Sequence, residues 1–224
     1  MRTRTLLPGL ARLLETCERL GLGAETTPSG RVPPEAGSMV GGHSLDPQLA
    51  ALYARYGRGY FASDIYFLRV DDSENELETQ TAWWRETWQS HVAVPLFIFG
   101  GVASLAYYFA TVPGLSDAQG HQPVVQVDTY ALDGLYALPI ASSVDRFFDT
   151  YARYLELAGA DPGFQEYGFS VLAFPWGVPH VVGRDERLVQ LIREGRFDPL
   201  MPDAESRAWA AKVLATCPVS SPGG

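Results

Sequence analysis

The sequence is poor in cysteine and almost without lysine. Its two cysteines, Cys17 and Cys217, lie near opposite ends of the 224-residue chain, and neither belongs to a CxxC pair. Two thiols so placed cannot form a zinc cluster without histidine ligands. We expect two isolated, reduced thiols, and a disulfide between the two ends of the chain is the alternative. Lys212 is the single lysine, so the remaining basic residues are arginines.

Long apolar runs and an excess of positive charge are also missing. No segment approaches the roughly 18 consecutive apolar residues that a membrane span needs. The N-terminal apolar stretch is interrupted by Arg12, Glu15 and Glu18, which is not typical of a secretory signal, and we expect a cytoplasmic protein. A formal net charge of −9 and a pI near 4.9 argue against nucleic acid and anionic membrane as partners, and they permit a basic protein partner.

Motifs of catalysis are absent from the sequence. No HExxH, GxSxG, GxxxxGK[ST] or Cys–His pattern connects the four histidines, which are His43, His91, His121 and His180. We therefore expect a protein that is not an enzyme, with no catalytic residues, no cofactor and no metal. The alternative is a small hydrolase that uses a loop histidine, His121 or His180.

Apolar residues are plentiful, because 46% of the chain is hydrophobic and 12% is aromatic, which is enough for a sizeable core. Leucines at helical spacing predict an amphipathic helix over residues 1–22. Residues 23–44 are rich in Gly, Pro, Ser and Thr, which favours a loop or linker. Asp46 followed by Pro47 begins a second helix, whose buried stripe extends to Tyr56 and which Gly57 ends.

Short apolar segments predict a run of strands. Gly100-Gly101 is expected to be a turn between two of them, and Asp133-Gly134 a hairpin turn. A helix capped by Ser142 or Ser143 then continues to Gly159. The strands are expected at 65–70, 94–99, 104–110, 124–130, 135–141 and 169–174, and two more helices at 184–194 and 203–215.

Strand alternation and helix spacing point a set of large apolar side chains toward one interior. We predict one core that contains Phe97, Phe99, Leu105, Tyr107, Val125, Val127, Phe147 and Tyr151.

Three segments in order resemble the SUKH superfamily, which is named for fungal cell-wall synthesis regulators and contains many bacterial immunity proteins. The segments are LDPQLAALYARYGRG, PLFIFGGVASLAYYF and VVQVDTYALDGLYALPIASSVDRFFDTYARYLEL. The resemblance covers residues 45–158, about half of the chain. It implies an α+β fold in which a mixed, mainly antiparallel sheet is flanked by helices. Helical extensions at both ends are expected from the residue spacing outside this region. The corresponding organisation is an N-terminal helix (1–22), a linker (23–44), a SUKH-like core (45–158), a C-terminal strand and helix extension packed on the core (159–219) and a tail (220–224).

The resemblance implies a non-catalytic immunity protein that neutralises a cognate bacterial toxin by direct binding. Such toxins are often nucleases with basic clefts, which an acidic protein can reach rapidly through electrostatic steering. A housekeeping scaffold or regulatory protein of the same fold is the alternative.

Two groups of residues are candidates for partner binding. The first is a predicted acidic loop over 71–78. The alternative is that this segment is an ordinary solvated loop with no role in binding. The second is a pair of tryptophans on one helix face, which serve either as interface anchors or as core residues. These candidates are Asp71, Asp72, Glu74, Glu76, Glu78, Trp84 and Trp88.

Overall fold

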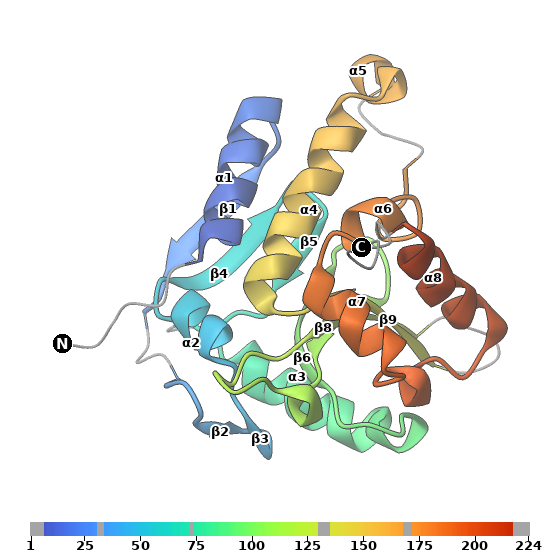
Figure 1. Cartoon of the computed structure of the whole chain (residues 1–224). Coiled ribbons are helices and arrows are strands. Elements are labelled where there is room, and N and C mark those ends of the chain that lie inside the picture. The colour runs from blue at the N-terminus through green and yellow to red at the C-terminus, as the bar shows by residue number, and fades with distance from the viewer. Residues whose placement is uncertain (1–6, 31–33, 72–73, 130–134, 168–171, 217–224) are drawn as a thin grey trace.

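The computed structural model describes residues 7–30, 34–71, 74–129, 135–167 and 172–216 (Figure 1). Within them the chain has an α+β fold, with eight α-helices, a seven-stranded antiparallel sheet and a separate two-stranded sheet. Helices precede the large sheet and follow it in sequence, as the predicted terminal extensions require. Among the described residues, none of the helices combines the length and the apolar composition needed to cross a bilayer.

The helices are α1 (Pro8–Leu20), α2 (Pro47–Tyr53), α3 (Glu76–Thr87), α4 (Val144–Gly159), α5 (Pro162–Tyr167), α6 (Pro179–Val182), α7 (Glu186–Arg193) and α8 (Ala204–Ala215), with short 3₁₀ turns η1 (Gln89–His91), η2 (Pro113–Leu115) and η3 (Asp198–Leu200). The strands are β1 (Ala24–Pro28), β2 (Met39–Val40), β3 (His43–Ser44), β4 (Tyr56–Phe61), β5 (Ile65–Phe67), β6 (Phe97–Val102), β7 (Tyr107–Thr111), β8 (Val124–Asp128) and β9 (Tyr136–Ala141).

The large sheet has the strand order β1-β4-β5-β6-β7-β8-β9, and every pairing in it is antiparallel. The prediction that residues 23–44 form a loop or linker is therefore wrong at both ends of this range, because β1 pairs with β4 along its length and β2 pairs with β3. The residues of β1 are mostly exposed, so this strand is held by the backbone ladder rather than by apolar burial. Such a strand leaves no alternating apolar pattern in the sequence.

Gly100 and Gly101 do not form the expected turn, because both lie inside β6 opposite β5. A Cβ atom on Gly100 would lie 2.2 Å from the carbonyl oxygen of Tyr66, and one on Gly101 would lie 2.8 Å from that of Tyr107. Only glycine allows the neighbouring backbones to approach so closely. The pair permits tight strand pairing, and the turn follows at residues 103–106.

Helices α1 and α4 cover one face of the sheet, and α3 lies against the other (Figure 1). On the first face, the Phe147 ring of α4 packs against Phe109 and Phe99, with ring centroids 4.6 Å and 6.0 Å apart. On the second face, Trp84 of α3 packs against Tyr108 at 6.2 Å. Phe109 and Tyr108 are consecutive in β7, so their side chains point to opposite faces, as strand geometry requires.

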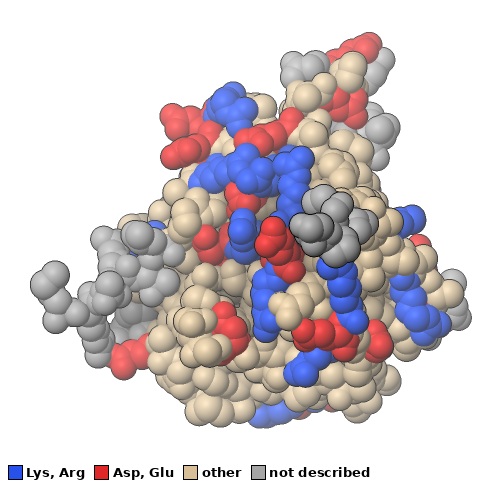
Figure 2. All heavy atoms as spheres, viewed as in Figure 1, with Lys and Arg blue, Asp and Glu red and all other residues tan. Residues whose placement is uncertain are grey.

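Helix α4 begins where the sequence indicates, because the Ser143 hydroxyl accepts a hydrogen bond from the amide of Arg146. The Asp145 carboxylate of α4 caps the N-terminus of α1, which is far away in the sequence, because it accepts hydrogen bonds from the amides of Gly9 and Leu10. Ion pairs from Arg12 to Asp149 and to Glu156 join the two helices further along. Figure 2 accordingly shows basic and acidic side chains interspersed on this side of the molecule.

The C-terminal extension is packed on the sheet through its last helices. Trp209 of α8 is buried, and its indole N–H donates to the carbonyl oxygen of Pro139 in β9 at 3.4 Å. Helices α7 and α8 agree with the predicted segments 184–194 and 203–215. The strand predicted at 169–174 lies partly outside the described residues, and Leu172–Phe174 is not a strand.

Six of the eight predicted core residues are buried, and two predictions about the core are wrong. Leu105 is 49% exposed and Tyr107 is only partly buried, because Leu105 lies in the turn between β6 and β7 and Tyr107 is the first residue after it. Tyr56 is not in the second helix, which ends at Tyr53, but begins β4. Cys17 is a buried free thiol whose pKa is raised by that burial, and Cys217 lies outside the described residues, as does the predicted turn at Asp133-Gly134.

Replacing Phe147 by alanine should destabilise the protein by about 3–5 kcal/mol, because the ring fills the interior between α4 and the sheet. The measurement is the free energy of unfolding in urea. Leu157→Ala, at a 38% exposed position of the same helix, is the matched control and should cost less than about 1 kcal/mol. Similar losses for the two variants would contradict this placement of α4.

Candidate functional site

A groove of about 440 Å³ opens on the face of the sheet that carries α3. Strands β4 and β5 form its floor, and the first half of α3 forms one wall. Its principal polar and aromatic lining residues are Arg58, Tyr60, Tyr66, Arg69, Glu76 and Gln80.

The groove exists because α3 covers only part of this face. Phe61 packs against Phe148 of α4 at 6.2 Å, so its neighbour Tyr60 must point to the opposite face. Tyr66, between the buried Ile65 and Phe67, does the same. These side chains reach the surface beside α3 and are only partly buried.

Three tyrosines form a row across this face of the sheet. Tyr60 pairs with Tyr66, Tyr66 pairs with Gly101, and Gly101 pairs with Tyr108. A Cβ on Gly101 would lie 3.0 Å from the Tyr66 hydroxyl, so the missing side chain makes room for that ring. Trp83 of α3 extends the row by packing on Tyr108 at 6.1 Å, and it is 38% exposed. We call Tyr60, Tyr66, Tyr108 and Trp83 the aromatic row.

Burial raises the pKa of the Tyr66 hydroxyl, and the nearby Tyr108 and Glu76 raise it further. A tyrosine hydroxyl is already protonated at neutral pH and can donate a hydrogen bond, and this shift extends that state to higher pH. A phenol of this kind has an apolar ring and one polar group, which is typical of residues in protein interfaces.

The acidic residues beside the groove are largely gathered around Arg69. Its guanidinium pairs with Glu74, and its Nε and Nη2 atoms lie 3.8 Å from Asp71 and 3.9 Å from Glu76. The Glu76 carboxylate also accepts from the Arg69 backbone amide at 2.8 Å. Three of the five predicted carboxylates thus share one cation, so the local negative charge is smaller than the sequence alone indicates.

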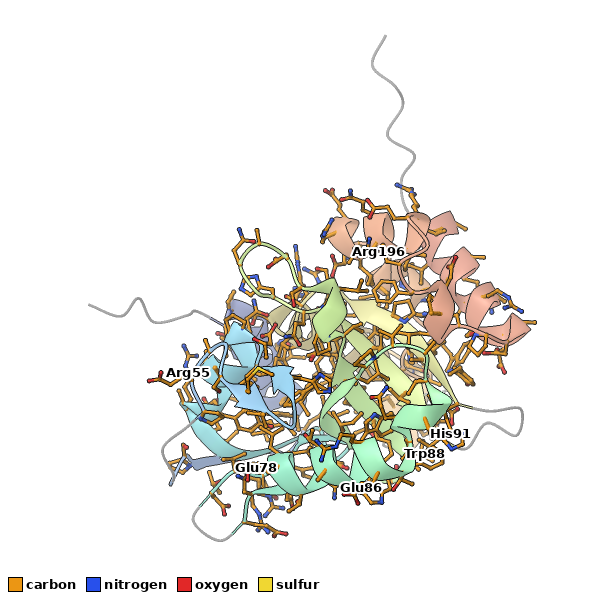
Figure 3. All side chains as sticks on the ribbon, turned by 90° about the horizontal axis from the view of Figure 1, so that it is seen from below. Arg55, Glu78, Glu86, Trp88, His91 and Arg196 are labelled. Carbon is orange, nitrogen blue, oxygen red and sulfur yellow. The ribbon has the colours of Figure 1, made fainter. Side chains whose placement is uncertain are left out.

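The predicted loop 71–78 is wrong in its second half, because α3 begins at Glu76. Asn75 caps it by accepting from the amide of Glu78, and the carboxylates of Glu76 and Glu78 in the first turn suit the positive end of the helix. Glu78 is exposed on α3, as is Glu86 further along the helix (Figure 3). Asp72 lies outside the described residues.

Trp84 of α3 and Trp88, the residue directly after the helix, lie on the same side of it, as predicted, with ring centroids 6.4 Å apart. Trp84 is 1% exposed and belongs to the core, and Trp88 is partly buried against the same core. Sequence reasoning missed Trp83 as the exposed tryptophan. The signal was present, because Leu77, Thr81 and Trp84 mark the buried stripe and Trp83 lies off it.

The two histidines of the hydrolase alternative lie in different elements. His121 lies in a loop, as predicted, with Nδ1 3.3 Å from an oxygen of Asp117, whereas His180 belongs to α6 and not to a loop. Within the described ranges, no group of three or more His, Cys, Asp or Glu side chains is placed to hold a metal ion.

Comparison with models of known protein families finds no match, and no curated protein sequence matches the chain. The SUKH resemblance therefore stays a prediction that depends on the three segments quoted above.

Replacing Glu76 by glutamine should lower the free energy of unfolding by about 1 kcal/mol, because the carboxylate accepts from the Arg69 amide and faces its guanidinium. The exposed Glu78→Gln, in the same helical turn, is the matched control and should cost at most about 0.5 kcal/mol. Urea unfolding of both variants measures the difference. Equal losses would mean that Glu76 contributes only its charge at the helix terminus.

Proposed function

We propose that the protein is a non-catalytic immunity protein that neutralises a cognate toxin in the cytoplasm by direct binding. The groove beside α3 and the aromatic row are its contact surface. The observation that carries this proposal is the aromatic row, in which partly exposed tyrosines of the sheet and the exposed Trp83 of α3 lie beside Arg58 and the groove. Tyrosine, tryptophan and arginine are the residues that contribute most to binding energy at protein interfaces.

The charge around this surface favours a basic partner. Glu74, Glu78 and Glu86 are exposed on or next to α3, and the whole chain has a formal net charge of −9. Such a field accelerates association with a basic protein and slows association with an acidic one. Asp71 and Glu76 contribute mainly by holding Arg69 at the rim of the groove. Trp84 and Trp88 contribute indirectly, because their packing against the core holds α3 on the sheet.

The function is tested by co-expression with the toxin that we expect the neighbouring gene to encode. The wild-type chain should restore growth, and Trp83→Ala should restore it poorly, because that ring lies exposed in the contact surface. Leu157→Ala is the control, since Leu157 is also 38% exposed but belongs to α4 on the opposite face. No protection by folded wild-type protein would overturn the immunity function. Full protection by Trp83→Ala would contradict the proposed contact surface but not the immunity function.

Reversing the two exposed α3 charges, Glu78→Lys with Glu86→Lys, should lower the association rate constant with the toxin by about tenfold at low salt. The loss should shrink as ionic strength rises, because salt screens exposed charges. Stopped-flow kinetics at several salt concentrations measures it. Glu15→Lys with Glu18→Lys makes the same change in net charge on α1, across the sheet, and should have a clearly smaller effect. Equal effects of the two double variants would leave net charge alone to explain the steering.

A further inference from the structure

A second, smaller cavity of about 270 Å³ lies on the opposite face of the sheet from the groove. It is enclosed by the ends of β5, β6 and β7, by α4 and by the segment 173–176. Five aromatic side chains and one carboxylate line it, together with apolar residues. The aromatic residues are Tyr107, Tyr151, Tyr154, Phe174 and Trp176, and the carboxylate is that of Asp64. We call this cavity the Asp64 pocket.

Contacts between the rings fix two walls of the Asp64 pocket. Tyr151, Tyr154 and Phe174 pack on one another, with centroids 5.1–5.3 Å apart. The Tyr154 hydroxyl donates to the carbonyl oxygen of Leu172 at 3.1 Å. Trp176 is held between Tyr136 and the buried Trp209, at 6.4 Å and 5.7 Å. The rings are therefore positioned before any ligand arrives, which lowers the entropic cost of binding.

Asp64 is fixed at the edge of the pocket by a hairpin turn between β4 and β5. Its amide donates to Phe61 and its carbonyl accepts from Ala103, at 3.1 Å and 2.7 Å. The two preceding residues, Ala62 and Ser63, have φ of 57° and 54°, in the left-handed region that such turns normally assign to Gly or Asn. Strained backbone of this kind persists where the surrounding structure demands it, often beside a binding site.

The Asp64 carboxylate accepts a hydrogen bond from Tyr151 on one oxygen. Within the described part of the chain, no ion pair compensates its charge, and its partial burial raises its pKa. A carboxylate taken out of water without a cation is unfavourable. A cationic ligand would remove that cost.

We propose that the Asp64 pocket binds an organic cation, namely an alkylammonium or guanidinium group. Aromatic faces are negative and attract a cation that has shed its water, and the Asp64 carboxylate supplies the opposite charge. An anion would be repelled by Asp64, and a neutral apolar ligand would leave the carboxylate buried without a counter-charge. A hard metal ion prefers several oxygen ligands, whereas one carboxylate among aromatic rings suits a soft, weakly hydrated cation.

The cation has two possible sources, a free quaternary ammonium compound or a lysine or arginine side chain of another protein. Calorimetric titrations with choline, with N-acetyl-lysine amide and with N-acetyl-arginine amide distinguish them. Tighter binding of choline assigns the pocket to a small molecule, and tighter binding of either amide assigns it to a side chain. The neutral analogue 3,3-dimethylbutan-1-ol has the shape of choline without its charge, and it should bind at least about tenfold more weakly than choline if choline is the preferred cation.

Asp64→Asn keeps an acceptor for the Tyr151 hydroxyl but removes the charge, and it should weaken binding of the preferred cation by about tenfold or more. Asp198→Asn, at an exposed position of η3, removes the same charge elsewhere and should bind as the wild type does. Trp176→Phe presents a weaker aromatic face and should bind several-fold more weakly. The Trp176 variant provides the comparison if Asp64→Asn fails to fold.

Absence of binding of all three cations to the folded wild type would overturn the proposal. Equal affinity for choline and its neutral analogue, or unchanged affinity in folded Asp64→Asn, would do the same. The titrations need no toxin, so their outcome is independent of the proposed immunity function.

Discussion

Apolar side chains on a sheet need a covering layer on every face that carries them, and in this chain the covering is unequal across the sheet. Strands β8 and β9 are buried almost throughout, whereas β4 alternates between buried and exposed positions and β1 is mostly exposed. Helices α1 and α4 close one face, and α3 reaches only part of the other. The open area beside α3 follows directly, and the side chains that β4 and β5 present there form the groove.

Helices α2 and α4 could be predicted because their signals are local. Asp46 before Pro47 and Ser143 before α4 have oxygen atoms that accept from backbone amides two or three residues later, so a short window of sequence determines where each helix begins. The role of Gly100 and Gly101 could not be predicted in the same way. These glycines are required by the distance to β5, whose residues lie more than thirty positions earlier in the chain. Nothing within a local window distinguishes that requirement from a turn.

The candidate site was only partly predictable, and the reasons differ between its residues. The charges of Asp71, Glu74 and Glu76 are evident from the sequence, but their arrangement around Arg69 depends on how the chain turns before α3. The tryptophans could be assigned to helix faces, because the spacing of Leu77, Thr81 and Trp84 defines the buried stripe. Tyr60, Tyr66 and Tyr108 could not be grouped, because strand register alone brings these distant tyrosines into one row.

Consecutive residues of two paired strands serve opposite faces of the sheet. In β5, Ile65 lines the Asp64 pocket and Tyr66 lines the groove, and in β6 Val102 lines the pocket while Gly101 leaves room for the Tyr66 ring. Because successive side chains of a strand alternate in direction, one strand pair can support two surfaces of different chemistry without sharing a residue between them. The hairpin turn at Ala62 and Ser63 completes this arrangement. It joins β4 to β5 tightly enough to place the Asp64 carboxylate beside Tyr151, and the ladder of hydrogen bonds and the packing of Phe61 on Phe148 offset the strain of its left-handed residues.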